Sequence, residues 1–166
     1  MEMFGFGKKK KVADDNSVYA PVTGQVIDLS EVSDPVFAQK AMGEGLGVKP
    51  SDGHIVSPVA GTVTMVASTK HALGFTMANG MEVLIHMGVD TVDLKGAPFT
   101  ISVQPGDIVN GGDDIATIDL DQVHEAKLDD VIIVVFPNSA DKLDHLDVST
   151  GQTKAKAKIG TVTVKA

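Results

Sequence analysis

The chain has 166 residues, enough for one well-filled core, and its net charge of −8 disfavours nucleic-acid binding because phosphate backbones attract clustered cations. All 14 basic residues are lysine, so any anion site must rely on histidine, lysine or backbone N–H groups in place of an arginine fork. The absence of cysteine excludes disulfides and thiolate nucleophiles, and the absence of a long apolar run or a secretory signal leads us to expect a soluble, cytoplasmic protein.

Residues 1–17 differ in composition from the rest of the chain. Met3, Phe4 and Phe6 precede four lysines at residues 8–11, and acidic and polar residues follow. We predict a flexible N-terminal segment over residues 1–17 and a single domain over residues 18–166. A second hypothesis for residues 1–12 is weak contact with a membrane surface, because apolar side chains beside a basic run partition at an anionic interface.

Short apolar runs separated by Gly, Pro, Asp and Asn turns begin at Tyr19, a pattern typical of all-β sandwiches and barrels. The pattern small-Pro-Val-x-Gly-x-Val occurs at residues 20–26 and again at residues 57–63, with its prolines 37 positions apart. A further turn lies at Gly106-Asp107. We therefore predict an antiparallel β-sandwich with a few short helices.

Three short helices are expected. Asp34 before Pro35 supplies an N-cap and a proline at the first helical position, which predicts a helix over residues 35–41. Residues 119–128, with an apolar face, and residues 138–146 are the other two candidates. The apolar run at residues 131–136 is expected to be a strand buried on both faces, and residues 160–165 alternate like a closing strand.

Two histidines fifteen residues apart, His71 and His86, are the best candidates for chemistry. An imidazole near its unperturbed pKa is a competent nucleophile at neutral pH, and a second imidazole beside it can donate a hydrogen bond to an anion. Strand period two places Leu84 and His86 on one face and the neighbouring apolar residues on the other, in the core. Partial burial of the His86 ring beside Leu84 would favour the neutral form of the ring.

Local partners for both rings can also be predicted. The backbone carbonyl of Gly88 can accept a hydrogen bond from Nδ1–H of His86, which would leave Nε2 free to attack. The hydroxyl of Thr69 can accept a hydrogen bond from one nitrogen of His71, which would leave the other nitrogen aimed at the shared pocket. A structural or solvated role stays open for either ring, and the other three histidines are expected to lie on the surface: His54, His124 and His145.

The string His71-Ala72-Leu73, followed by residues 80–96 (GMEVLIHMGVDTVDLKG), resembles the glucose-type IIA component of the bacterial phosphoenolpyruvate:sugar phosphotransferase system. The similarity also covers both copies of the Pro-Val repeat, the region around Asp34 and Phe37, and the Gly106-Asp107 turn. It implies a barrel-sandwich hybrid fold that carries one phosphohistidine.

That resemblance implies a role for each site residue. His86 would accept a phosphoryl group on Nε2 from the carrier HPr and donate it to the cysteine of a IIB domain of a sugar permease, without a cofactor or a required metal. His71, oriented by Thr69, would stabilise the phosphoryl oxygens, while Gly88 holds His86. The partner-binding residues would be two acidic and four apolar side chains: Asp34, Asp90, Val36, Phe37, Leu84 and Val92.

Regulatory partners are also implied by the resemblance, although Ala67 stands where some members carry phenylalanine, so the choice of target is expected to differ.

Two alternatives remain open from the residues alone. His86-Met87-Gly88-Val89-Asp90 contains H-x-x-x-D, half of a zinc-peptidase motif, and His71 with His86 offers an adventitious zinc site. The Gly106-Asp107 turn resembles that of lipoyl- and biotin-carrying domains, although Lys40 stands in the wrong sequence order for an acceptor lysine.

Overall fold

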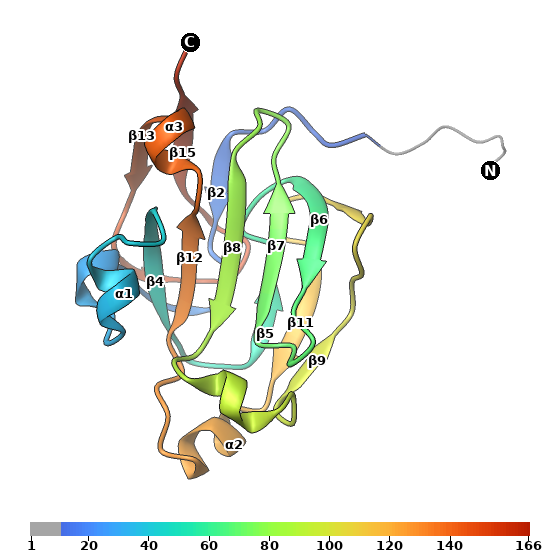
Figure 1. Cartoon of the computed structure of the whole chain (residues 1–166), viewed down its shortest axis with the longest axis vertical. Helices are drawn as coiled ribbons and strands as arrows, with labels where there is room; N and C mark the ends of the chain where they lie inside the picture. Colours follow the sequence, from blue (N-terminus) through green and yellow to red (C-terminus); the bar gives the residue numbers. More distant parts are fainter. Residues whose placement is uncertain (1–10) are drawn as a thin grey trace, which may run out of the picture.

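Three antiparallel sheets form the framework of the computed structural model, which describes residues 11–166 (Figure 1). The largest sheet has eight strands, in the spatial order β10 (Ile108–Val109), β6 (Gly61–Val66), β7 (Ala72–Thr76), β8 (Glu82–Met87), β12 (Ile132–Phe136), β4 (Glu44–Pro50), β3 (Gly24–Asp28) and β14 (Gly151–Thr153). Two three-stranded sheets accompany it: β5 (His54–Val56), β11 (Asp114–Ile118) and β9 (Phe99–Ile101), and β13 (Leu143–Val148), β15 (Lys158–Val164) and β2 (Ser17–Tyr19).

One continuous apolar core contains residues from all three sheets, with Val134, Ile115 and Val162 as examples. The inward-facing residues are mostly Val, Ile, Leu, Met and Phe, which suit pleated, buried surfaces. The predicted antiparallel β-sandwich is therefore confirmed.

The central strand β12 is buried along its whole length, as its apolar sequence predicted. Ile132, Val134 and Phe136 point into the main core, whereas Ile133 and Val135 belong to a second apolar cluster on the opposite face. That second face is covered by the helices η1 (Leu29–Glu31) and α1 (Pro35–Ala38). The strand therefore needs apolar side chains at every position.

The two copies of the Pro-Val repeat contact each other at equivalent atoms. The N–H of Tyr19 donates to the carbonyl of Pro58 at 2.8 Å, and the N–H of Val56 donates to the carbonyl of Pro21, also at 2.8 Å. Each copy then leads into a strand of the large sheet, β3 or β6. The repeat seen in the sequence is thus also an internal repeat of the structure, in which the residue before each copy bonds the proline of the other copy.

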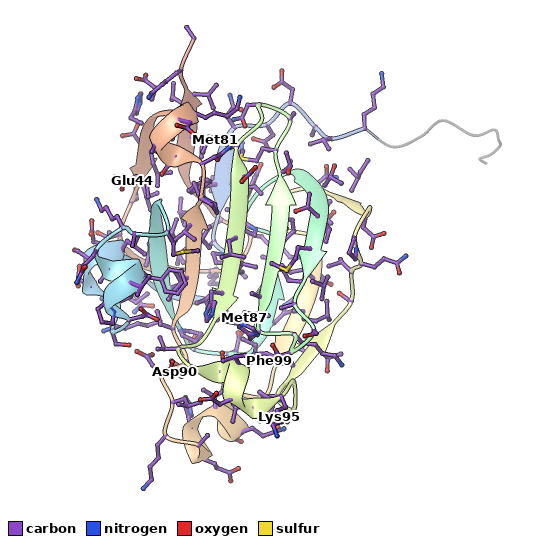
Figure 2. All side chains as sticks on the ribbon, in the orientation of Figure 1. Glu44, Met81, Met87, Asp90, Lys95 and Phe99 are labelled. Atoms are coloured by element: carbon purple, nitrogen blue, oxygen red, sulfur yellow. The ribbon has the colours of Figure 1, made fainter. Side chains whose placement is uncertain are left out.

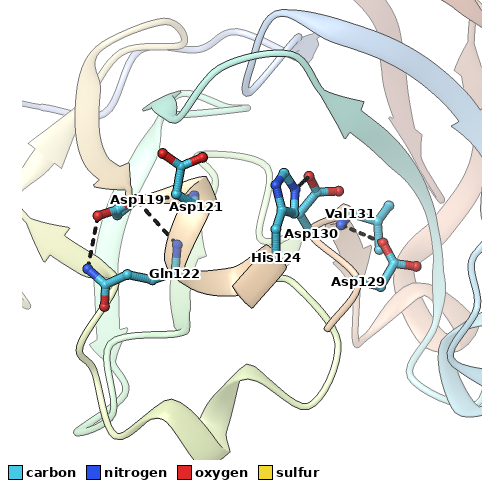
Figure 3. A network of polar contacts seen from close by, with 7 residues as sticks. All are labelled: Asp119, Asp121, Gln122, His124, Asp129, Asp130 and Val131. Atoms are coloured by element: carbon cyan, nitrogen blue, oxygen red, sulfur yellow. Dashed lines mark hydrogen bonds and ion pairs between the residues drawn. The ribbon is translucent and has the colours of Figure 1, made fainter. Parts of the chain in front are cut away.

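Two of the expected helices are present and shorter than predicted. Asp34 caps α1 by accepting the N–H of Val36 at 2.8 Å, and α1 ends at Ala38 before Lys40 takes φ +63°. Asp119 caps α2 (Leu120–Glu125) through the N–H groups of the first turn (Figure 3). The predicted apolar face of α2 packs on the main core.

The helix predicted over residues 138–146 is wrong in its second half. The helix α3 spans only Ser139–Lys142, and the chain continues as the strand β13. Leu143 is buried in the main core, and β13 pairs with the closing strand β15. Pairing with a distant strand therefore outweighs the local helical preference, whereas the predicted closing strand itself is confirmed.

The N-terminal predictions fall largely outside the described residues, which begin at Lys11. The last residues of the segment expected to be flexible are hydrogen-bonded: Asp15 accepts from the Tyr19 hydroxyl at 2.5 Å, and Asn16 accepts the N–H of Val162 at 2.8 Å. Among the described residues no helix is long and apolar enough to span a membrane.

Truncation of a β12 side chain tests the importance of the central strand. Ile132→Ala should lower the free energy of unfolding by about 2–5 kcal/mol, because it leaves a cavity in a fully buried site. Thr100→Ala, on the exposed face of β9, should change it by less than about 0.5 kcal/mol. Urea unfolding measures both, and equal losses would contradict this account of the core.

Candidate functional site

Strand β8 presents His86 on the outer face of the large sheet. Val83, Ile85 and Met87 are buried in the core, while Leu84 and His86 are half-buried on the other face. This alternation confirms the predicted orientation of the strand. Figure 2 shows Met87 together with Asp90 at the end of β8 from which the chain turns away.

The antiparallel pairing of β7 with β8 brings the two candidate histidines together. His71 immediately precedes β7, and its carbonyl accepts the N–H of Met87 at 2.8 Å. The ring centroids of His71 and His86 lie 5.0 Å apart, with an interplanar angle of 76°. Backbone hydrogen bonds therefore fix the separation of the two rings.

Both predicted hydrogen-bond partners of the rings are confirmed. Nδ1 of His86 lies 2.7 Å from the carbonyl oxygen of Gly88, and Nδ1 of His71 lies 2.6 Å from the Thr69 hydroxyl. A carbonyl oxygen can only accept, so the proton of the neutral His86 ring is on Nδ1. The lone pair of Nε2 is then free for attack on an electrophile.

Burial keeps both rings neutral. Desolvation lowers the pKa of His86 below its usual value, and the nearby His71 ring lowers it further. The hydrogen bond to Gly88 and the charges of Asp34 and Asp90 act in the opposite direction without reversing the shift. Desolvation also lowers the pKa of His71. At neutral pH the site therefore offers an uncharged nucleophile.

Apolar side chains lie near His86, and the charges of Asp34 and Asp90 also act on its ring. The Phe37 ring lies 5.2 Å from the His86 ring, and Phe37 is only 7% exposed, so it packs against the histidine more than it forms surface. Val36 and Val92 are 51% and 45% exposed. These two are the strongest candidates for apolar contacts with another protein.

The remaining histidines are exposed, as predicted, and each contacts an aspartate that the prediction did not include. His54 lies 2.8 Å from Asp114, and His145 lies 3.2 Å from Asp147. His124 lies 2.7 Å from Asp130 (Figure 3), and this hydrogen bond raises the pKa of His124.

The open alternatives find little support in the site. Residues 11–166 contain no group of three or more histidine or acidic side chains arranged to hold a metal ion, whereas a tetrahedral zinc site takes three protein ligands or more. Lys40 follows α1 and forms an ion pair with Glu44 at 3.0 Å, so it is not at a hairpin tip where a carrier domain presents its lysine.

The residues that support the turn after β8 were not among the predicted site residues. Thr91 is fully buried and donates its hydroxyl to the carbonyl of Met87 at 2.6 Å. The carbonyl groups of Val131 and Asp129 accept the N–H groups of Gly88 and Val89. Gly88, two residues after His86, indicates the turn, but no local sequence pattern indicates that Asp129 and Val131 support it.

Ring titrations test the electrostatics of the site. In an NMR pH titration, His71 and His86 should titrate below the usual histidine value near 6.5, because burial penalises the charged ring, whereas His124 should titrate above it. Asp130→Asn should remove the upward shift of His124 and leave His86 unchanged. A His86 midpoint at or above that of His124 would contradict this description.

Substitution of Gly88 tests the turn that positions the carbonyl. Gly88 has φ +84°, and an added Cβ would lie 2.4 Å from Cγ2 of Thr91, so Gly88→Ala combines left-handed strain of about 1–2 kcal/mol with a steric clash. Gly106→Ala is the matched control, because Gly106 has φ +97° with nothing within 4 Å of the added Cβ. Urea unfolding should show the larger loss for Gly88→Ala, and equal losses would contradict the clash.

Comparisons with known proteins agree with the geometry. Residues 16–142 match the family described as the phosphoenolpyruvate-dependent sugar phosphotransferase system, EIIA 1. A glucose-specific EIIA component of Staphylococcus aureus (strain COL) is 42% identical over 154 residues, which cover 90% of this chain and 93% of the relative. The glucose-specific EIIA component of Halalkalibacterium halodurans is 42% identical over 163 residues, covering 96% and 92%.

A solved structure extends the similarity to the fold. The glucose permease IIA from Mycoplasma capricolum superposes with a TM-score of 0.78 at 32% identity, covering 95% of this chain and 98% of that one. The resemblance inferred from the residues around His71 and His86 is thus confirmed at the level of the family. This chain belongs to the EIIA family of the phosphoenolpyruvate-dependent sugar phosphotransferase system and is a phosphoryl carrier of that system.

Proposed function

We propose that His86 is the residue of this EIIA component that carries the phosphoryl group. The observation that supports this most strongly is the hydrogen bond between Nδ1 of His86 and the Gly88 carbonyl, which leaves Nε2 as the free nitrogen of a neutral, half-buried ring. The other three histidines differ from His86, because each is exposed and bonds the carboxylate of an aspartate.

The proposed reaction has two balanced steps. The lone pair of His86 Nε2 attacks the phosphorus of the phosphohistidine on HPr, the N–P bond of the donor breaks, and its electron pair returns to the donor ring. The thiolate of a IIB cysteine then attacks the same phosphorus and releases His86. Phosphoryl transfer passes through a loose transition state, which needs alignment of the reacting atoms and stabilisation of charge. In this proposal neither step requires a cofactor or a metal.

The neighbouring groups supply that stabilisation. Positive charge develops on the His86 ring as Nε2 attacks, and the Gly88 carbonyl stabilises it through Nδ1–H. In this proposal the Thr69 hydroxyl donates to Nδ1 of His71, the reverse of the direction expected from the sequence. The proton of His71 is then on Nε2, from which it can donate to a phosphoryl oxygen. Thr69 is therefore a positioning residue for His71 in this proposal.

The partners proposed are HPr as donor and a IIB domain as acceptor, with regulatory proteins as further targets. A relative from Streptococcus pneumoniae is named a glucose-specific EIICBA component. It is 46% identical over 146 residues, which cover 20% of its length, and its name combines a IIA part with IIB and IIC parts. Val36 and Val92 would form the apolar contact, with Asp34 and Asp90 facing a basic partner, and Leu84 and Phe37 beneath.

We further propose that residues 18–166 form the EIIA domain and that it works in the cytoplasm, where its partners deliver the phosphoryl group. Matches to glucose-specific relatives along nearly their full length support a place in a glucose-type transport chain.

Phosphoryl transfer from phosphoenolpyruvate through enzyme I and HPr tests the proposal. Wild-type chain should gain one acid-labile phosphoryl group, His86→Ala should gain none, and His71→Gln should accept the group but pass it to a IIB domain about a hundredfold more slowly, because the glutamine amide can still donate a hydrogen bond but, unlike the imidazole, cannot take up a proton to stabilise the phosphoryl oxygens. His124→Gln, at an exposed ring, is the matched control and should behave as wild type. Label that persists in His86→Ala would overturn the assignment.

A further inference from the structure

The peptide unit between Gly88 and Val89 is held from both of its ends. Its carbonyl oxygen, from Gly88, accepts from Nδ1 of His86 at 2.7 Å. Its N–H, from Val89, donates to the backbone carbonyl of Asp129 at 3.0 Å. The C=O and N–H of a trans peptide point in opposite directions in one plane, so the bond to Asp129 fixes the direction in which the Gly88 carbonyl points.

A second hydrogen bond fixes the same turn. The N–H of Gly88 donates to the carbonyl of Val131 at 2.8 Å, so residues 129–131 hold two consecutive peptide units after β8. These residues connect α2 to β12, and β12 itself pairs with β8. The orientation of the His86 ring therefore depends on a segment more than forty residues away in the chain.

The side chain of Asp129 holds this segment in place. Its Oδ1 accepts the N–H of Val131 at 3.0 Å (Figure 3), which fixes the local backbone. Its Oδ2 accepts the hydroxyl of Ser33 at 2.7 Å, and Ser33 immediately precedes Asp34, the N-cap of α1. One carboxylate thus connects the segment behind Gly88 to the chain that leads into α1, where Phe37 packs against the His86 ring.

We infer that Asp129 is a positioning residue for His86: its carboxylate holds residues 129–131 so that the peptide between Gly88 and Val89 aims its carbonyl at Nδ1. The inference rests on the proposed role of His86 as the phosphoryl acceptor. Asp129 does not touch the reacting nitrogen, and it acts through the backbone.

Three variants separate this role from a general effect on the fold. Asp129→Ala removes both side-chain hydrogen bonds and, because Asp129 is exposed, leaves no cavity in the core. Asp129→Asn keeps an oxygen for Val131 N–H and an amide that can donate to the Ser33 oxygen. Asp130→Ala is the matched control on the same loop, since the Asp130 side chain bonds the exposed His124.

The readouts are the ¹⁵N and Nδ1–H resonances of the His86 ring, the rate of phosphoryl acceptance from HPr, and the thermal midpoint. Asp129→Ala should shift or broaden the Nδ1–H signal of His86 and slow acceptance about tenfold, because small displacements of a reacting group are costly. Asp129→Asn should restore both, and Asp130→Ala should leave both unchanged.

Two results would overturn the inference: wild-type ring signals and rates in Asp129→Ala, or the same changes in Asp130→Ala as in Asp129→Ala. The ring signals are recorded on the unphosphorylated protein, so they report on positioning by Asp129 even if His86→Ala were to show that another residue carries the phosphoryl group. Failure of the inference and failure of the proposed function are therefore distinguishable.

Discussion

The hydrogen bond from Nδ1–H of His86 to the Gly88 carbonyl is the interaction on which the rest of the site depends. It assigns the proton of the ring to one nitrogen and exposes the other to an incoming group. The bond is possible because Gly88 adopts φ +84°, a conformation that L side chains rarely take and that the packing of Thr91 reserves for glycine. The turn is local, but its direction is fixed by carbonyl groups of residues 129 and 131.

Opposing effects act on the charge of His86, and their balance suits a nucleophile. Asp34 and Asp90 favour the protonated ring, as does the Gly88 carbonyl, whereas burial and His71 disfavour it. Burial is the largest of these effects, so the pKa moves downward and the ring is neutral at neutral pH. The same acidic side chains remain available to a basic partner, which makes attraction of that partner compatible with an uncharged ring.

Features set by neighbours in sequence were predictable, and those set by distant contacts were not. The hydrogen bonds of His86 and His71 each span two residues, and the burial of Val83 follows from strand periodicity, so the sequence indicates all of them. The bond between Ser33 and Asp129 spans 96 residues, and nothing near either residue indicates it. The helix expected over residues 138–146 is wrong in its second half for a similar reason, because the chain from Leu143 onward pairs with β15 further along the chain.

A carrier that uses one nitrogen for both acceptance and donation has consequences for its surface. Because Nδ1 is tied to Gly88, under the proposed role both partners must approach Nε2 from the same side, and they cannot bind together. The surface beside Nε2 then has to suit two different proteins. Exposed aliphatic side chains such as Val36 and Val92 meet this requirement better than directional polar groups would, since apolar contact depends on area removed from water and is not directional. Exact hydrogen-bond geometry is therefore needed at the His86 ring and the Gly88 carbonyl, whereas the surrounding surface can contact different partners.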